Sequence, residues 1–174
     1  MLKPDYAEAH CNLGIVLHHS GKLDKAEASY RQAIALKSEF PEAYSNLGIT
    51  LQEAGKLKEA DASYNQAIEL SPGYAEAHSN LGNMLKELGR LEEAEASYNQ
   101  AIALDPNLAE AHNNLGTTLQ ELGRLEEAKA RWKQSLLLQP NFFDGARNLV
   151  KLPVGRLEPD AINLCEKALN SVDG

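Results

Sequence analysis

The chain has 174 residues, 43% hydrophobic and 24% charged, and its 17 Lys and Arg against 25 Asp and Glu give a formal net charge of -8. This composition is typical of a globular protein, and the negative charge argues against nucleic acid as a ligand, because that binding relies on clustered Lys and Arg. No apolar run approaches the roughly 18 residues of a membrane span and the start has no signal-peptide pattern, so we expect a cytoplasmic protein without membrane contact.

The first residues of the chain match the end of a later repeat. The segment LKPDY, from Leu2 to Tyr6, corresponds to LSPGY, from Leu70 to Tyr74. We therefore interpret residues 1–6 as the end of a truncated preceding repeat. A stacked repeat without its neighbour exposes its stacking face, so we expect an open face near residue 7 and, as a hypothesis, self-association through it.

A repeat then organises the chain. The segments EAHCNLG, EAYSNLG, EAHSNLG and EAHNNLG place asparagines at 12, 46, 80 and 114, each 34 residues after the last. A fixed period of this length indicates a fold built from stacked copies. We predict four copies, 7–40, 41–74, 75–108 and 109–142, followed by a degenerate fifth copy or capping helices over 143–174, and we number positions within each copy from its first residue.

Each copy is predicted to form two antiparallel helices. The first helix follows a proline-containing turn and ends at a glycine, because glycine readily adopts the left-handed conformation that ends helices. Apolar residues of the second copy fall on one face of each helix: Leu47, Leu51, Leu57, Ala60, Tyr64, Ala67 and Ile68. The glycine at position eight costs about 1 kcal/mol inside a helix, which predicts that two helix backbones approach closely there. These glycines are Gly14, Gly48, Gly82 and Gly116.

The last segment departs from this pattern. Pro153 should end a short helix, and the stop glycine is Gly155 instead of the residue at 157. We expect a second helix from Pro159, with Ile162, Leu164, Cys165, Ala168 and Leu169 covering the fourth copy and Asp160, Asn163, Glu166 and Lys167 facing outward. The alternative is a linker to a catalytic domain.

These motifs together resemble the tetratricopeptide repeat family. The Leu-Gly pair of the first helix, the glycine stop, the alanine and aromatic of the second helix and the closing Asp-Pro carry the resemblance, closely over residues 3–142 and loosely over 143–171. It implies an all-α fold, a right-handed superhelical solenoid of antiparallel helix hairpins. In that family, positions two, five, six, nine, twelve and thirteen line a concave groove.

The asparagines at position six would then form a ladder along the groove: Asn12, Asn46, Asn80, Asn114 and Asn148. A carboxamide offers an acceptor and two donors, so it can bind the main chain of an extended peptide. The pattern is similar to the asparagine ladder in the repeats of O-linked N-acetylglucosamine transferases, whose groove holds protein substrates by their backbone. The alternative is that the amides serve packing between copies or were inherited by duplication.

The charges in the predicted groove favour a neutral or basic ligand. Position two is acidic in every copy, including Glu42, Glu76 and Glu110. The other groove residues that we expect to contact a peptide are Asn83, Lys86, Glu87 and Gln120. Few are basic, which argues against the acidic chaperone tails that co-chaperone repeats bind through Lys and Arg. A carboxylate at position two also stabilises the start of its own helix, and this is the alternative explanation.

Catalytic chemistry has little support in the sequence. His10, His78 and His112 lie one per copy, and adjacent His18 and His19 diverge on a helix, so neither set suggests a metal site. Cys11 and Cys165 have no metal or redox spacing and are expected to be free thiols. We expect no enzyme activity and no cofactor.

We therefore expect a protein-protein interaction scaffold that binds extended peptide segments in its concave groove. Two alternatives remain open. The repeats could be the substrate-recruiting module of a larger enzyme such as a glycosyltransferase, or they could form a self-assembling architectural solenoid.

Overall fold

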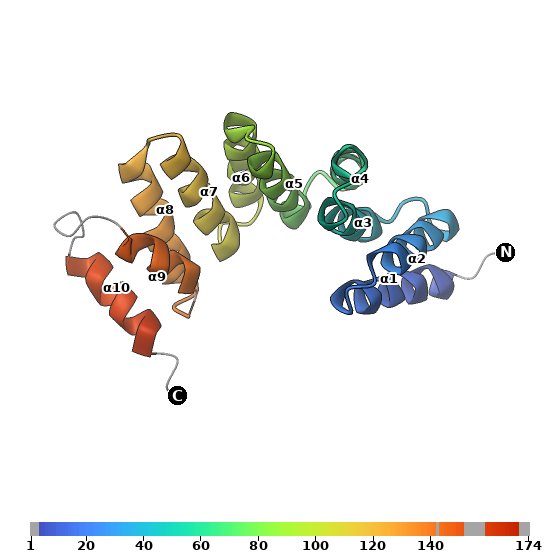
Figure 1. The fold of residues 1–174 in the computed structure, drawn as a ribbon, viewed down its shortest axis with the longest axis horizontal. Helices are drawn as coiled ribbons and strands as arrows, with labels where there is room; N and C mark the ends of the chain where they lie inside the picture. Colours follow the sequence, from blue (N-terminus) through green and yellow to red (C-terminus); the bar gives the residue numbers. More distant parts are fainter. Residues whose placement is uncertain (1–3, 142, 152–158, 171–174) are drawn as a thin grey trace. The chain divides into compact units, whose positions relative to one another are not determined.

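The computed structural model describes residues 4–141, 143–151 and 159–170. The chain divides into two compact units, residues 1–84 and 85–174. All regular elements in the described residues are α-helices, so the predicted all-α class is confirmed (Figure 1). They are α1 (Pro4–His19), α2 (Leu23–Leu36), α3 (Pro41–Glu53), α4 (Leu57–Leu70) and α5 (Ala75–Glu87), then α6 (Leu91–Leu104), α7 (Ala109–Glu121), α8 (Leu125–Leu138), α9 (Phe143–Val150) and α10 (Pro159–Asn170). Helix α5 contains the division between the units.

The N-terminal unit is built from helix hairpins. Helix α1 packs against α2, α3 packs against α4, and α2 also contacts α3 (Figure 1). The hairpin turns end the first helices at glycines in the left-handed region, with φ of 70° at Gly21 and 73° at Gly55. At the second turn, the N–H of Gly55 bonds to Gln52 O at 2.9 Å and that of Lys56 to Leu51 O at 2.8 Å. This pair of bonds is the Schellman motif, so the predicted glycine stop is confirmed.

The position-eight glycines make room for an aromatic ring. A Cβ placed on Gly48 would lie 2.6 Å from Cε1 of Tyr64, and one on Gly14 would lie 2.6 Å from Cε1 of Tyr30. Both tyrosines are almost completely buried, at 1% and 2% exposure. The sequence led us to expect a second helix backbone at these glycines, but in these two copies the nearest atoms belong to a ring from the second helix of the same hairpin.

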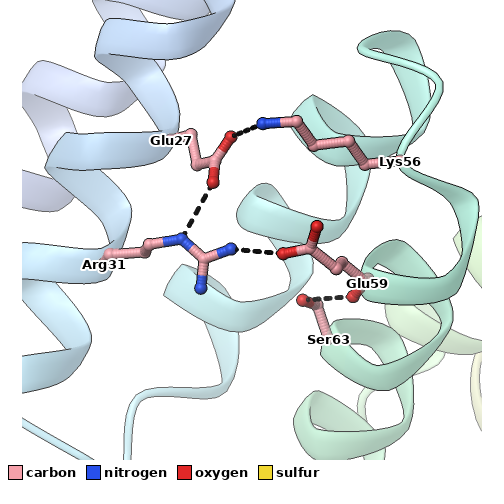
Figure 2. Close-up of polar contacts among 5 residues, drawn as sticks. All are labelled: Glu27, Arg31, Lys56, Glu59 and Ser63. Carbon is pink, nitrogen blue, oxygen red and sulfur yellow. Dashed lines mark hydrogen bonds and ion pairs between the residues drawn. The ribbon is translucent and has the colours of Figure 1, made fainter.

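An ion network joins the second helices of the first two hairpins (Figure 2). Arg31 on α2 donates to Glu27 at 2.9 Å and to Glu59 on α4 at 2.7 Å, and Lys56 donates to Glu27 at 2.8 Å. The Glu27 side chain is 16% exposed, whereas Arg31 and Glu59 are about half exposed, at 50% and 55%. Glu27 is thus the sheltered centre of the network, with one cation from each hairpin.

The C-terminal unit has the same local construction. Helix α7 packs against both α6 and α8, and its glycine stop at Gly123 has a φ of 78°. Trp132 on α8 is fully buried and donates its indole N–H to Asn113 O at 3.2 Å. A Cβ on Gly116 would lie 2.6 Å from Nε1 of Trp132 and 3.1 Å from the backbone oxygen of Ala128. Here both a ring and a backbone carbonyl approach the glycine.

Helices α9 and α10 pack against α8 and against each other (Figure 1). Helix α10 begins at Pro159, as predicted. Cys165 and Ala168 are buried, and the Cys165 thiol lies 3.8 Å from Ala146 O. Ile162, which was expected to be covered, is 44% exposed, and Leu164 is half-buried. The predicted helix break at Pro153 and the glycine at 155 fall outside the described residues.

Both cysteines are free thiols, and both are buried. Among the described residues, no helix is both long enough and apolar enough to cross a bilayer.

Candidate functional site

In the N-terminal unit, the position-six asparagines bond to the preceding copy. Asn46 is half-buried and its Nδ2 donates to Cys11 Sγ at 4.0 Å, a weak hydrogen bond. Asn80, also half-buried, donates from Nδ2 to Ser45 Oγ at 3.3 Å. Both acceptors occupy position five of the preceding copy. Asn12, the first member of the predicted ladder, is exposed.

The C-terminal unit repeats this contact with a longer chain of amides. Asn148 donates from Nδ2 to Asn113 Oδ1 at 3.2 Å, with Thr117 Oγ1 at 3.5 Å, and Asn113 in turn donates to Asn114 Oδ1 at 3.2 Å. Asn114 and Asn148 are half-buried, whereas Asn113 is buried. In this unit too, a position-six amide is held by the position-five residue of the preceding copy.

The contact between copies, which the sequence left as an alternative role for the asparagines, is therefore present. It leaves part of each amide unused, because a carboxamide has two N–H groups and two acceptor lone pairs. The carbonyl oxygens of Asn46 and Asn80 have no hydrogen-bond donor among the described residues. An anchored amide with an open carbonyl is suited to accept an N–H from a ligand.

The position-five residues were the part of this site that sequence reasoning missed. It placed position five in the groove but assigned no role to Cys11, Ser45 or Asn113, because Cys, Ser and Asn share no obvious pattern. Tyr74 was missed as well: it is half-buried, and burial, then the carboxylates of Glu76 and Glu42, raise its pKa. An aromatic at the end of the first two complete copies, Phe40 and Tyr74, was the available signal.

Carboxylates lie near the position-five and position-six residues of the N-terminal unit. Glu42 and Glu76 are exposed in the first turns of α3 and α5. Burial raises the pKa of the Cys11 thiol, and the charges of Glu42 and Glu8 raise it further. These carboxylates therefore act on the residue that anchors Asn46, so the local potential is negative beside the amides. In the C-terminal unit, Glu110 is likewise exposed in the first turn of α7.

The remaining predicted site residues lie on α5 and α7. Asn83 and Lys86 are half-buried, and Glu87 and Gln120 are exposed. The second copy shows how position twelve can be used internally, since Tyr64 donates its hydroxyl to Gln52 Oε1 at 2.9 Å. In the fourth copy, the aromatic is Trp132, whose N–H goes to the backbone of Asn113 instead. The exchange of tyrosine for tryptophan removes the hydroxyl that would otherwise bond to Gln120.

The position-four histidines bind the turn before their own helix. Nε2 of His78 lies 3.2 Å from Pro72 O, and that of His112 lies 3.0 Å from Pro106 O. Burial lowers the pKa of His112. His18 pairs instead with Glu53 of the next copy, at 3.1 Å. In the part of the chain that the structure describes, no three His, Cys, Asp or Glu residues are grouped as metal ligands.

Two cavities lie at equivalent positions on the side of the second helices. The N-terminal one has a volume of about 510 Å³, and its lining includes Arg31, Tyr44, Glu59 and Gln66. The C-terminal one has a volume of about 340 Å³, and its lining includes His112, Glu127, Arg131 and Gln134. Tyr44, Glu59 and Gln66 correspond to His112, Glu127 and Gln134, each 68 residues later. Both are shallow surface features between neighbouring helices, and the sequence analysis did not predict them.

Solved structures provide the comparison of the fold. The chain matches PilF of Pseudomonas aeruginosa with a TM-score of 0.82 and 24% identity, covering 95% of this chain and 76% of that one. It matches YrrB, a TPR protein with an unusual peptide-binding site, with a TM-score of 0.66 and 24% identity over 92% of this chain and 84% of that one. The first TPR of Spaghetti (RPAP3), bound to the HSP90 peptide SRMEEVD, matches with a TM-score of 0.66 and 27% identity, over 70% of this chain and 97% of that one.

Sequence comparison identifies the repeat itself. A segment of 36 residues is 53% identical to the human protein O-mannosyl-transferase TMTC2, but it is 21% of this chain and only 4% of that protein. The profile described as TPR repeat matches residues 16–55, 51–89 and 82–123, and the profile described as tetratricopeptide repeat matches 109–142. These matches cover well over half of the chain, which therefore belongs to the tetratricopeptide repeat family.

Proposed function

We propose that this protein is an interaction scaffold that holds extended segments of partner proteins along its first helices, through the position-six amides. The observation that carries the proposal is the state of Asn46 and Asn80: half-buried, anchored through nitrogen, and with the carbonyl oxygen unpaired among the described residues. Asn12, Asn114 and Asn148 are the corresponding amides of the other copies. Lys86, Glu87, Asn83 and Gln120 are proposed as further contacts with the ligand.

Two of the structural neighbours support a peptide ligand. YrrB is described as having a peptide-binding site, and the Spaghetti repeat domain was solved with an HSP90 peptide. The peptide in the second case is acidic, and we propose the opposite preference here. The exposed carboxylates of Glu42, Glu76 and Glu110 would repel an acidic segment and attract a neutral or basic one.

The test is selection of peptides from a displayed library of disordered protein segments, followed by titration of the selected peptides against purified variants. Asn46→Ala and Asn80→Ala should each weaken binding by about three- to tenfold, since a net hydrogen bond contributes about 1 kcal/mol. Asn65→Ala is the matched control, because the Asn65 amide is exposed on α4 and bonds within its own helix to Asp61.

We expect the selected peptides to be neutral or basic, and the binding of the basic ones to weaken with added salt. Equal affinity of wild-type protein and both ladder variants would assign the asparagines to packing between copies alone. Selection of acidic peptides would contradict the preference for neutral or basic ligands and leave the groove itself as the site.

The resemblance to the human O-mannosyl-transferase favours a second candidate. In this case the same groove would recruit substrates for a glycosyltransferase domain in the same polypeptide. Since the matched segment is one repeat in length and 4% of that protein, the enzyme activity itself stays a proposal. A full reading frame that encodes such a domain would support it, and transfer of sugar to a groove-bound peptide would test it.

An open helix face in the N-terminal unit favours self-association as a third candidate. Leu13 and Val16 on α1 are 49% and 62% exposed, whereas the equivalent Leu47 and Thr50 on α3 are 3% and 0% exposed. Leu47 and Thr50 are buried beside another hairpin of the same chain. We therefore propose that a second copy of the chain covers the equivalent exposed face formed by Leu13 and Val16. Light scattering should show a mass that rises with concentration, and Val16→Lys should abolish the rise; a monomer at every concentration would refute the idea.

A further inference from the structure

The bonds between position five and position six suggest how the ladder is held in its binding orientation; this inference rests on the proposed function. We propose that the position-five residue is a positioning residue, which fixes the amide of the next copy with its nitrogen toward the preceding copy and its carbonyl oxygen open to a backbone N–H of the ligand. In the N-terminal unit the pairs are Cys11 with Asn46 and Ser45 with Asn80. In the C-terminal unit the pair is Asn113 with Asn148.

The three contacts have a common polarity. In each one the donor is Nδ2 of the position-six asparagine and the acceptor is a side-chain atom 35 residues earlier. The acceptors are chemically different, a thiol, a hydroxyl and an amide oxygen, while the donor is always the same. This constancy indicates that the orientation of the asparagine is what the contact specifies.

Fixing an amide in advance strengthens ligand binding because the rotamer freedom of the side chain is already lost before the ligand arrives. A half-buried asparagine without an anchor can rotate about its terminal torsion, which has broad preferences. Its carbonyl oxygen would then face the ligand for only part of the time. Ser45 thus affects affinity through Asn80 without touching the peptide.

The orientation also defines the ligand more narrowly. The open carbonyl oxygens of Asn46 and Asn80 can only accept, so the segment must present backbone N–H groups to them. Proline has no backbone N–H. We therefore expect that a proline placed at either contact in a bound peptide abolishes that contact, and that proline-rich segments are poor ligands.

The experiment uses a lysine-containing peptide selected from the displayed library and the full chain. Ser45→Ala should weaken its binding by about three- to tenfold, and Ser45→Asn should restore it, because Asn113 fills the same role in the fourth copy. Ser63→Ala is the matched control. Ser63 is also a buried serine of the N-terminal unit, 8% exposed, but its hydroxyl bonds to Glu59 O of its own helix at 2.8 Å.

A second readout needs no ligand. The side-chain NH₂ resonances of Asn80 should shift in Ser45→Ala and return toward the wild-type position in Ser45→Asn. In a double mutant, Ser45→Ala should add nothing to the loss caused by Asn80→Ala, since the two residues act through one contact.

The outcomes separate this inference from the proposed function. If Asn80→Ala weakens binding and Ser45→Ala does not, the groove stands and the positioning role is refuted. An unchanged Asn80 resonance in Ser45→Ala would also overturn the positioning role. If neither Asn80→Ala nor Ser45→Ala changes affinity, the proposed function fails and this inference fails with it.

Discussion

Gly48 on α3 lies directly against the ring of Tyr64 on α4, so closely that a Cβ at position 48 would be 2.6 Å from Cε1 of the ring. The ring is 1% exposed and its hydroxyl donates to Gln52 at 2.9 Å. The Tyr64 ring is therefore fixed both by its burial in the core and by a hydrogen bond to α3. Glycine occupies position 48 despite its cost in helix propensity, because any larger residue would displace the ring.

Gly48→Ala should destabilise the protein although alanine is the better helix former. Overpacking a core costs about 1–3 kcal/mol, and the gain in helix propensity is about 1 kcal/mol, so we expect a net loss of up to about 2 kcal/mol in the free energy of unfolding. Gly73→Ala is the control, since a Cβ there meets nothing within 4 Å. Urea titration followed by circular dichroism measures both, and a Gly48→Ala protein as stable as wild type would contradict the packing argument.

Glu27→Gln should weaken the ion network between α2 and α4 (Figure 2). The loss should be about 0.5–1 kcal/mol at low salt and smaller at high salt, because exposed ion pairs contribute little and are screened. The ammonium of Lys56 and the guanidinium of Arg31 lower the pKa of Glu27. A lowered folded-state pKa gives stability that is present above the ordinary carboxyl pKa and lost as pH falls through the folded value.

Unfolding of wild type and Glu27→Gln should therefore be compared from neutral to acidic pH. The difference between them should shrink as the pH falls below about 4. Glu39→Gln, at an exposed carboxylate, controls for the change in net charge. A difference that stays constant with pH would show that Glu27 acts by packing and not by charge.

Acidification should also destabilise the C-terminal unit through His112. The imidazole is 4% exposed and its Nε2 lies 3.0 Å from Pro106 O. Burial lowers the pKa of His112 in the folded protein. As the pH falls, the unfolded chain therefore binds a proton at a higher pH than the folded protein does. The free energy of unfolding is thus highest above about pH 6.5 and decreases as the pH falls through that value. His112→Tyr, which introduces the residue type of Tyr44, should flatten the pH dependence between about 6.5 and 5. An unchanged slope would exclude His112 as its source.

Trp132 is expected to be the most costly side chain to remove in the C-terminal unit. It is fully buried, so Trp132→Ala should cost about 3–5 kcal/mol. Trp132→Phe keeps much of the apolar surface but loses the bond to Asn113 O, which is worth about 1 kcal/mol, in addition to the lost ring volume. Far-UV circular dichroism is the suitable probe, because the chain has a single tryptophan. Equal losses in the two variants would mean that the indole N–H bond and the extra ring volume together account for the whole cost.

The sequence determined the features that depend on local backbone chemistry and on the period of the repeat. Glycines 21, 55, 89 and 123 all have a positive φ, a conformation that residues with a Cβ rarely adopt. Apolar residues three and four apart had to face a common core, which predicted Leu47, Leu51, Ala60 and Tyr64 as buried residues correctly. The period alone identified the position-six asparagines as a set, and the family followed from the same motifs.

Only the tertiary structure decided what these residues contact. The bonds of Asn46, Asn80 and Asn148 reach side chains 35 residues earlier, and this distance in sequence is bridged only when neighbouring copies stack. Packing within one hairpin placed a ring against Gly48, and Ile162 on α10 was left exposed. A repeat pattern fixes which positions are equivalent, whereas hydrogen bonds and close packing depend on distances between helices to within a few tenths of an ångström, and the pattern does not specify those distances.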